Sequence, residues 1–154
     1  PEMSRGLGDV YKRQTKMLAK DGEGATKLLE CTVTGAKDLD TAIIVAKSVI
    51  CSPLFKCAMF GADANWGRIL CAVGYAEADF DINKVDVSLS SKAGEIHVCH
   101  NGAGIEFSEE VAKTVLLEDE ITISVSIGDG SGTATAWGCD LTYDYVKING
   151  DYRS

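Results

Sequence analysis

The sequence is poor in several features that would mark particular classes of protein. Its 154 residues include only 2 prolines, no apolar run near the roughly 18 residues of a membrane-spanning helix, and no apolar leader for secretion. The 15 basic residues are outnumbered by 23 acidic ones, and the net charge of −8 gives no electrostatic footprint for nucleic acid or an anionic membrane. We therefore predict a cytoplasmic protein that binds neither nucleic acid nor membrane.

Signatures of metal binding are also weak. No CxxC pair occurs among the 6 cysteines, so a zinc ribbon has little support, and in a chain of this length we expect free, mostly buried thiols. His97, Cys99 and His100 are candidate metal ligands, but strand alternation places His97 and Cys99 on one face and His100 on the other. With only 2 histidines and no GxSxG motif, a Ser-His-Asp site is also disfavoured. We therefore expect no metal site and no catalytic triad.

The first fourteen residues differ from the rest of the chain. They show no hydrophobic periodicity, and the string RGLGDVYKRQ resembles a translated cloning adapter more than the start of a domain. We predict that residues 1–14 are a foreign or unstructured leader and that residues 15–154 form the functional region.

Helices are predicted in the first half of that region. Apolar residues recur at helical spacing from Leu39 to Ile50, and Pro53 should end this helix and begin a second one that runs to Gly61. A third helix should follow Asn65. A fourth, in the second half of the chain, should follow a serine with two glutamates behind it. The expected N-terminal caps are Asp38, Ser52, Asn65 and Ser108.

Strands are predicted from about residue 80 onward, where apolar residues alternate with polar ones. The segments 85–89, 96–98 and 121–127 show this alternation, and 133–139 should return as the hairpin partner of 121–127. Residues 141–148 fit a helix or a strand. Helices followed by strands indicate an α+β fold with a mixed or antiparallel sheet and helices packed on one face.

Two glycine-rich segments are candidates for ligand binding. GDGSG (128–132) lacks a following helix or a Lys-Ser pair, so a turn between strands is more consistent than a phosphate loop. DGEGATK (21–27) places Glu23 between two glycines, where the backbone can turn tightly and bring a carboxylate to a substrate ammonium group. A solvated turn before a strand explains DGEGATK equally well, and the residues alone leave both interpretations open.

Several segments taken together resemble one family. GEGATK (22–27), AKSVICSPLFKCAMFGADANWGRILCAVGY (46–75), ATAWGCDLTYDYVKIN (134–149) and DYRS (151–154) are similar in order and spacing to the ornithine acetyltransferases, or glutamate N-acetyltransferases, of the ArgJ family. The resemblance covers about residues 15–154 and identifies them with the C-terminal part of the family's β chain. It also agrees with the predicted α+β fold.

The resemblance implies an enzyme of arginine biosynthesis. Such an enzyme transfers acetyl from N2-acetyl-L-ornithine to L-glutamate through an acetyl-threonine intermediate. Family members arise from a precursor that cuts itself into α and β chains, and the resemblance implies an α2β2 heterotetramer. No cofactor or metal is implied, although bifunctional members also accept acetyl-CoA as a co-substrate.

The resemblance further assigns residues of this chain. Substrate-binding positions of the family fall on Glu23, on Asn149 and on Ser154, where most members have threonine. We expect Asn149 and Ser154 to supply hydrogen-bond donors to a substrate carboxylate. No catalytic residue is assigned, because the nucleophilic threonine of the family lies upstream of these segments, and the chain alone should be inactive. Two alternatives are a non-catalytic module that binds amino acids and a module for subunit contact.

Overall fold

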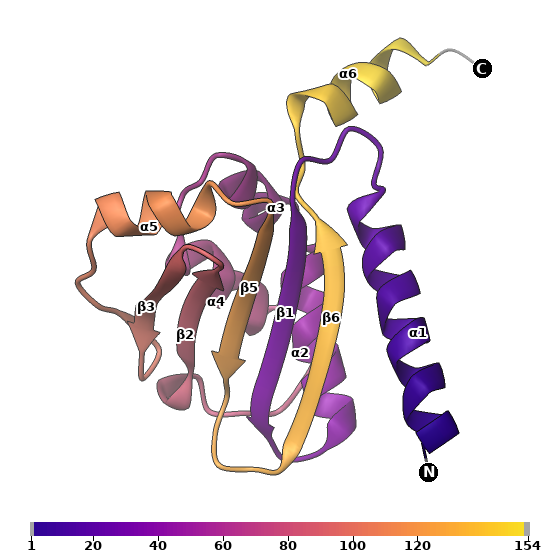
Figure 1. Cartoon of the computed structure of the whole chain (residues 1–154). Coiled ribbons are helices and arrows are strands. Elements are labelled where there is room, and N and C mark those ends of the chain that lie inside the picture. Colours follow the sequence, from indigo (N-terminus) through magenta and orange to yellow (C-terminus); the bar gives the residue numbers. More distant parts are fainter. Residues whose placement is uncertain (1, 153–154) are drawn as a thin grey trace.

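The computed structural model describes the backbone of residues 2–152 and the side chains of residues 8–152, and its centre is a mixed sheet of six strands (Figure 1). The strand order is β4-β3-β2-β5-β1-β6. The strands are β1 (Leu28–Ala36), β2 (Asp86–Ser91), β3 (Gly94–His100), β4 (Ala103–Gly104), β5 (Glu120–Ser126) and β6 (Gly132–Cys139). The helices are α1 (Glu2–Lys20), α2 (Leu39–Cys51), α3 (Pro53–Phe60), α4 (Trp66–Gly74), α5 (Glu109–Leu116) and α6 (Tyr143–Asp151), with a 3-10 turn at Ile82–Lys84.

Local signals in the sequence place the helix starts correctly. The side chains of Asp38, Ser52, Asn65 and Ser108 each accept a hydrogen bond from a backbone N–H of the following turn. Residues 141–148, whose sequence fits a helix or a strand, lead into and largely belong to α6, which is capped by Thr142. The predicted caps are therefore confirmed, because each depends only on residues within one turn of the chain.

The predicted hairpin between residues 121–127 and 133–139 is wrong. β1 lies between β5 and β6, parallel to the first and antiparallel to the second, so that Cys31 pairs with Ile123 on one side and Ala136 on the other. The glycine-rich loop crosses the end of β1, where the Gly130 N–H donates to the Gly35 carbonyl. The error arises because β1 is nearly ninety residues earlier in the sequence, beyond the reach of turn signals.

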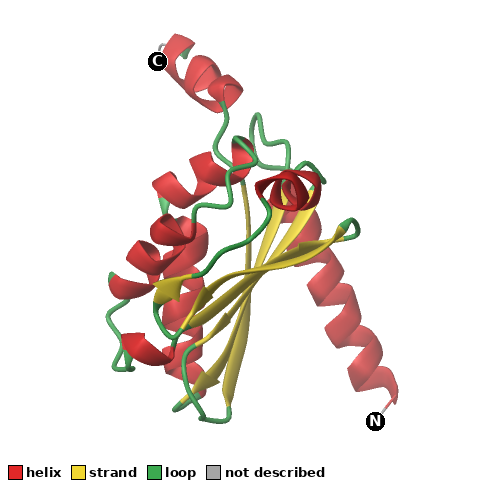
Figure 2. Ribbon diagram, turned by 90° about the vertical axis from the view of Figure 1, so that its left-hand side faces the viewer, coloured by secondary structure: helices red, strands yellow, loops and turns green. Residues whose placement is uncertain are grey.

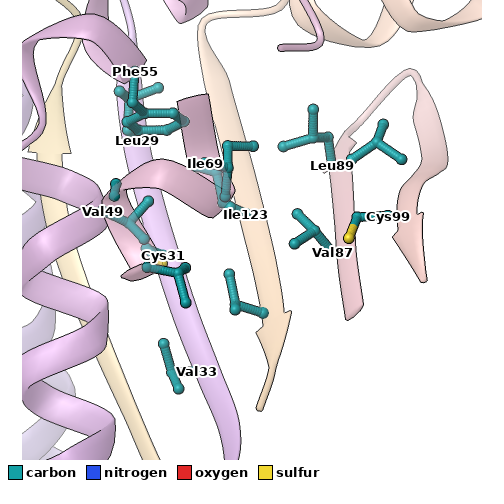
Figure 3. Close-up of a cluster of buried hydrophobic side chains, with 14 of the residues drawn as sticks. Leu29, Cys31, Val33, Val49, Phe55, Ile69, Val87, Leu89, Cys99 and Ile123 are labelled. Atoms are coloured by element: carbon teal, nitrogen blue, oxygen red, sulfur yellow. The ribbon is translucent and has the colours of Figure 1, made fainter. Parts of the chain in front are cut away.

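One face of the sheet carries the apolar core (Figure 3). Alternate residues of the strands, such as Leu29 on β1 and Ile123 on β5, are fully buried beneath α2, α3, α4 and α5. Phe55 from α3 and Ile69 from α4 are fully buried in the same cluster. The prediction of an α+β fold with a mixed sheet is confirmed, and α2–α5 pack on one face as expected, whereas α1 departs from that expectation.

Helix α1 lies against the opposite, polar face of the sheet (Figure 2). Lys16 contacts the carboxylate of Glu30 on β1 at 2.6 Å, and Lys20 contacts Asp119 and Glu120 at 3.2 Å. Because residues 2–14 belong to this helix, the expectation of an unstructured leader is not met. Their predicted foreign origin stays a prediction.

Within the described residues, no helix taken singly has both the length and the apolar character to span a membrane. α2 and α3 taken together, as a pair bent by 58°, meet those two criteria.

Gly35 gives a direct test of the crossing between β1 and the glycine-rich loop. Its φ is +73°, and a Cβ there would collide with the carbonyl of Gly128. We expect Gly35→Ala to lower the free energy of unfolding by about 2–3 kcal/mol, since strain and a backbone clash add. Gly74→Ala is the control, because nothing lies within 4 Å of its Cβ position. Equal urea midpoints for the two variants would contradict this crossing.

Candidate functional site

The glycine-flanked loop of residues 21–26 and helix α6 form one site. α6 stands out from the sheet beyond the end of β6, next to this loop (Figures 1 and 2). Gly24 has φ +68°, and a Cβ on it would lie 2.8 Å from the backbone nitrogen of Tyr145. A Cβ on Gly22 would lie 2.5 Å from the sulfur of Cys139. Both glycines are therefore required for the close approach of the loop to β6 and α6.

Two of the three predicted substrate-binding residues meet at this site. The Asn149 side-chain amide donates to Glu23 Oε2 at 2.8 Å, across 126 residues of sequence. The same amide nitrogen donates to the Tyr145 carbonyl at 2.9 Å. Ser154, the third predicted residue, lies outside the described residues.

The contacts of Asn149 change its expected chemistry. Both of its N–H donors are already used within the protein, so its free group is the amide oxygen. Glu23 is exposed and retains its second carboxylate oxygen. The pair therefore presents hydrogen-bond acceptors and a negative charge, which suit a ligand ammonium group rather than a carboxylate.

Asp140 anchors the loop from the end of β6. Its buried carboxylate accepts from the Thr26 N–H at 2.8 Å, the Thr26 hydroxyl at 2.5 Å and the Lys27 N–H at 2.9 Å. Two residues further on, the Thr142 hydroxyl donates to the Gly24 carbonyl at 2.6 Å. The segment that leads into α6 is therefore hydrogen-bonded to the loop at two positions, Gly24 and Thr26.

Lys27 is a buried cation next to this anchor. Its Nζ donates to the carbonyl oxygens of Met59 at 2.6 Å and Leu116 at 2.7 Å, which end α3 and α5. Helix C-termini carry partial negative charge, so the single ammonium group of Lys27 interacts favourably with the C-terminal ends of both helices. Burial lowers the pKa of Lys27, and the nearby Asp140 carboxylate partly offsets that shift.

The histidine candidates do not converge. A β-bulge in the pairing of β2 with β3 breaks the alternation, so that Val98 and Cys99 are both buried while His97 is exposed. The prediction that His97 and Cys99 share a face is therefore wrong. His100 Nδ1 contacts Asp86 at 2.8 Å, and its Nε2 lies 2.9 Å from the amide of Asn101, so both ring nitrogens are engaged.

The cysteines are free, as predicted, but most of them are not buried. Cys31 and Cys99 are buried and Cys139 is half-buried, whereas Cys51, Cys57 and Cys71 are exposed. Burial raises the pKa of the Cys31 thiol to about 12, so this thiol is inert. The predicted burial fails because these exposed cysteines occupy the outer faces of α2, α3 and α4.

The GADANWGR segment (residues 61–68) caps α4 and packs against β4. Asn65 caps α4, and the Trp66 ring covers Gly104 so closely that a Cβ there would overlap the indole. Arg68 donates to the Leu54 carbonyl at 3.1 Å beside a groove of about 600 Å³ between α2, α3 and α4. This groove lies outside the site of Glu23 and Asn149.

The fold and the site define an α+β domain in which a carboxylate between two glycines accepts a hydrogen bond from helix α6. The ArgJ family model matches residues 1–154. The chain belongs to the ArgJ family.

Individual relatives agree with this assignment. The chain is 55% identical over 150 residues to the arginine biosynthesis bifunctional protein ArgJ of Caldanaerobacter subterraneus. The aligned region covers 97% of this chain and 37% of that protein. It is 44% identical to the glutamate N-acetyltransferase of Methanosarcina mazei, over 99% of this chain and 39% of that protein. The crystal structure of the bifunctional ArgJ protein from Bacillus halodurans superposes with a TM-score of 0.92 at 44% identity, covering 98% of this chain and 70% of that one. The chain thus spans under two fifths of the length of these curated relatives.

Three residues of the site were not predicted from the sequence. Asp140, Thr142 and Lys27 are the buried polar residues that join the loop to β6 and α6. The available signal was the position of Asp140 directly after a strand-like segment and of Lys27 at the end of the GEGATK motif. Neither pattern indicates a partner more than one hundred residues away.

Proposed function

We propose that this chain supplies part of the amino-acid-binding site of an arginine-biosynthesis acetyltransferase that acts on N2-acetyl-L-ornithine and L-glutamate. Glu23 and Asn149 would contact the substrate, and Ser154 would contribute a hydroxyl group. The observation that carries the proposal is the contact of Asn149 with Glu23 at 2.8 Å. Glu23 is a candidate from its own sequence pattern and Asn149 from family resemblance alone, and the structure brings the two residues together.

The free groups of this pair favour one kind of contact. A substrate ammonium group placed between the Glu23 carboxylate and the Asn149 amide oxygen would donate one hydrogen bond to a charged acceptor and one to a neutral acceptor. N2-acetyl-L-ornithine carries a free ammonium group on its side chain. Glutamate carries an α-ammonium group, which must lose a proton to a base before its nitrogen can accept the acetyl group. Glu23 thus acts in binding and orientation rather than in bond making.

The acetyl-transfer step itself requires a nucleophile that the proposal assigns to another part of the family's polypeptide. By resemblance, a threonine at the start of a self-cleaved β chain takes the acetyl group, and glutamate then collects it. N2-acetyl-L-ornithine is the proposed donor, with acetyl-CoA as a second donor in a bifunctional enzyme. An α2β2 assembly would bring the α chain to this site.

The activity of the isolated chain is a first test of this division of roles. We expect the purified 154-residue polypeptide to transfer no acetyl from N2-acetyl-L-ornithine to L-glutamate above background, as measured by chromatography of both amino acids. Turnover proportional to polypeptide concentration would mean that this chain contains the nucleophile.

A chimera supplies the positive arm. In it, the residues of this chain replace the matching part of the Methanosarcina mazei glutamate N-acetyltransferase, to which they are 44% identical. We expect the chimera to transfer acetyl groups. A non-catalytic amino-acid-binding or subunit-contact module would leave a folded chimera inactive.

A further inference from the structure

Asp140 is a buried carboxylate whose hydrogen-bond donors come from one short segment of the chain. Its exposed fraction is 3%, and its side chain accepts three hydrogen bonds, all from the adjacent residues Thr26 and Lys27. Its backbone N–H also donates to the Lys27 carbonyl at 3.3 Å. Two of the donors belong to Thr26, three residues after Glu23, so the carboxylate fixes the end of the glycine-flanked loop.

The same residue fixes the start of α6. Asp140 follows β6 directly, and Thr142 both caps α6 and donates to the Gly24 carbonyl. α6 has no buried residue, and its edge-to-face contact with Phe60 of α3 is made by its first residue, Tyr143, so packing contributes little to the position of Asn149. The position of Asn149 on α6 relative to Glu23 on the loop therefore depends on the hydrogen bonds around Asp140.

We propose that Asp140 is a positioning residue that sets the separation of Glu23 and Asn149 through its hydrogen bonds to Thr26 and Lys27. This inference rests on the proposed function for its catalytic meaning. Asp140 does not touch the ligand, because its carboxylate is buried beneath the loop and its oxygens are occupied by the three donors. Its role is to hold the two acceptor groups ready before substrate arrives, which lowers the cost of ordering them on binding.

Thr26 permits a conservative test. Thr26→Val keeps the shape but removes the hydroxyl that donates to Asp140 at 2.5 Å, whereas Thr26→Ser retains it. Asp140→Asn retains the size of the side chain but replaces one acceptor oxygen with a donor. The first pair of variants avoids the burial of a mismatched amide and keeps the proposal testable if Asp140→Asn does not fold.

The readout is the side-chain amide of Asn149 in NMR spectra of the 154-residue chain, recorded at one neutral pH. The response is the change in the chemical shift of this amide that Glu23→Gln causes in the same background, because the substitution replaces the carboxylate that accepts from the amide. We expect a full response in the unaltered chain and in Thr26→Ser, and a response at least about twofold smaller in Thr26→Val and Asp140→Asn. The indole N–H of Trp137, which donates to Glu30, shows that the sheet is intact.

An unchanged Asn149 response in folded Thr26→Val would overturn the positioning role. In the chimera, we expect Thr26→Val to raise the KM for glutamate about tenfold with little change in kcat, whereas simple loss of folded enzyme would lower kcat at constant KM. The NMR measurement needs no substrate. An inactive unaltered chimera would therefore overturn the proposed function, and an unchanged Asn149 response would overturn the positioning role.

Discussion

Lys27→Met is expected to lower the free energy of unfolding by about 3 kcal/mol or more, which would make it one of the most destabilising single changes in the chain. The lysine is 8% exposed, and its ammonium group donates to carbonyls in the last turns of α3 and α5. Methionine fills similar space but removes the ammonium donor from both carbonyls, of which the Met59 carbonyl keeps a hydrogen bond from the Ala62 N–H at 3.2 Å. It also removes the positive charge nearest the buried Asp140.

Urea unfolding followed by circular dichroism measures this effect. The control is Lys47→Met, which makes the same chemical change at an exposed position on α2 and should alter stability by less than about 0.5 kcal/mol. Similar unfolding midpoints for the two variants would show that Lys27 does not hold the ends of α3 and α5 together.

Glu23→Gln in the chimera is expected to lower kcat/KM for glutamate by about 10- to 100-fold, because the substrate ammonium group then contacts an uncharged amide in place of a carboxylate. Glutamine keeps the length of the side chain, so the fold should be unaffected. Asn149→Ala should have an effect of similar size, since it removes the second acceptor and releases Glu23 from its 2.8 Å contact.

Glu106→Gln is the matched control, with the same loss of charge at an exposed position between β4 and α5. Steady-state kinetics with both glutamate and N2-acetyl-L-ornithine will show which substrate depends on the pair. Indistinguishable kinetics for Glu23→Gln and Glu106→Gln would remove Glu23 from the binding site.

The fold was predictable from the sequence wherever it depends on neighbouring residues. The caps Asp38, Ser52, Asn65 and Ser108 contact backbone groups three residues away, and each was recognised. The position of β1 was not recognised, because its partners β5 and β6 lie about one hundred residues later and pairing across that distance leaves no local pattern. The same limit produced the incorrect hairpin.

The site shows the same division between local and distant information. The residues of GEGATK already indicate a carboxylate presented between glycines, whereas Asn149 was assigned only through family resemblance. Asp140 and Lys27 were missed, because a buried carboxylate is recognisable only when its donors are known. The structure also changed the chemistry expected of Asn149, whose N–H groups are both used inside the protein.

The most direct test of the central claim is the initial rate of acetyl transfer from N2-acetyl-L-ornithine to L-glutamate by the chimera, measured beside the intact Methanosarcina mazei protein. The account predicts transfer within about tenfold of the intact protein, because the Glu23 and Asn149 groups supplied by this chain would occupy equivalent positions. A folded chimera that transfers no acetyl groups would contradict it.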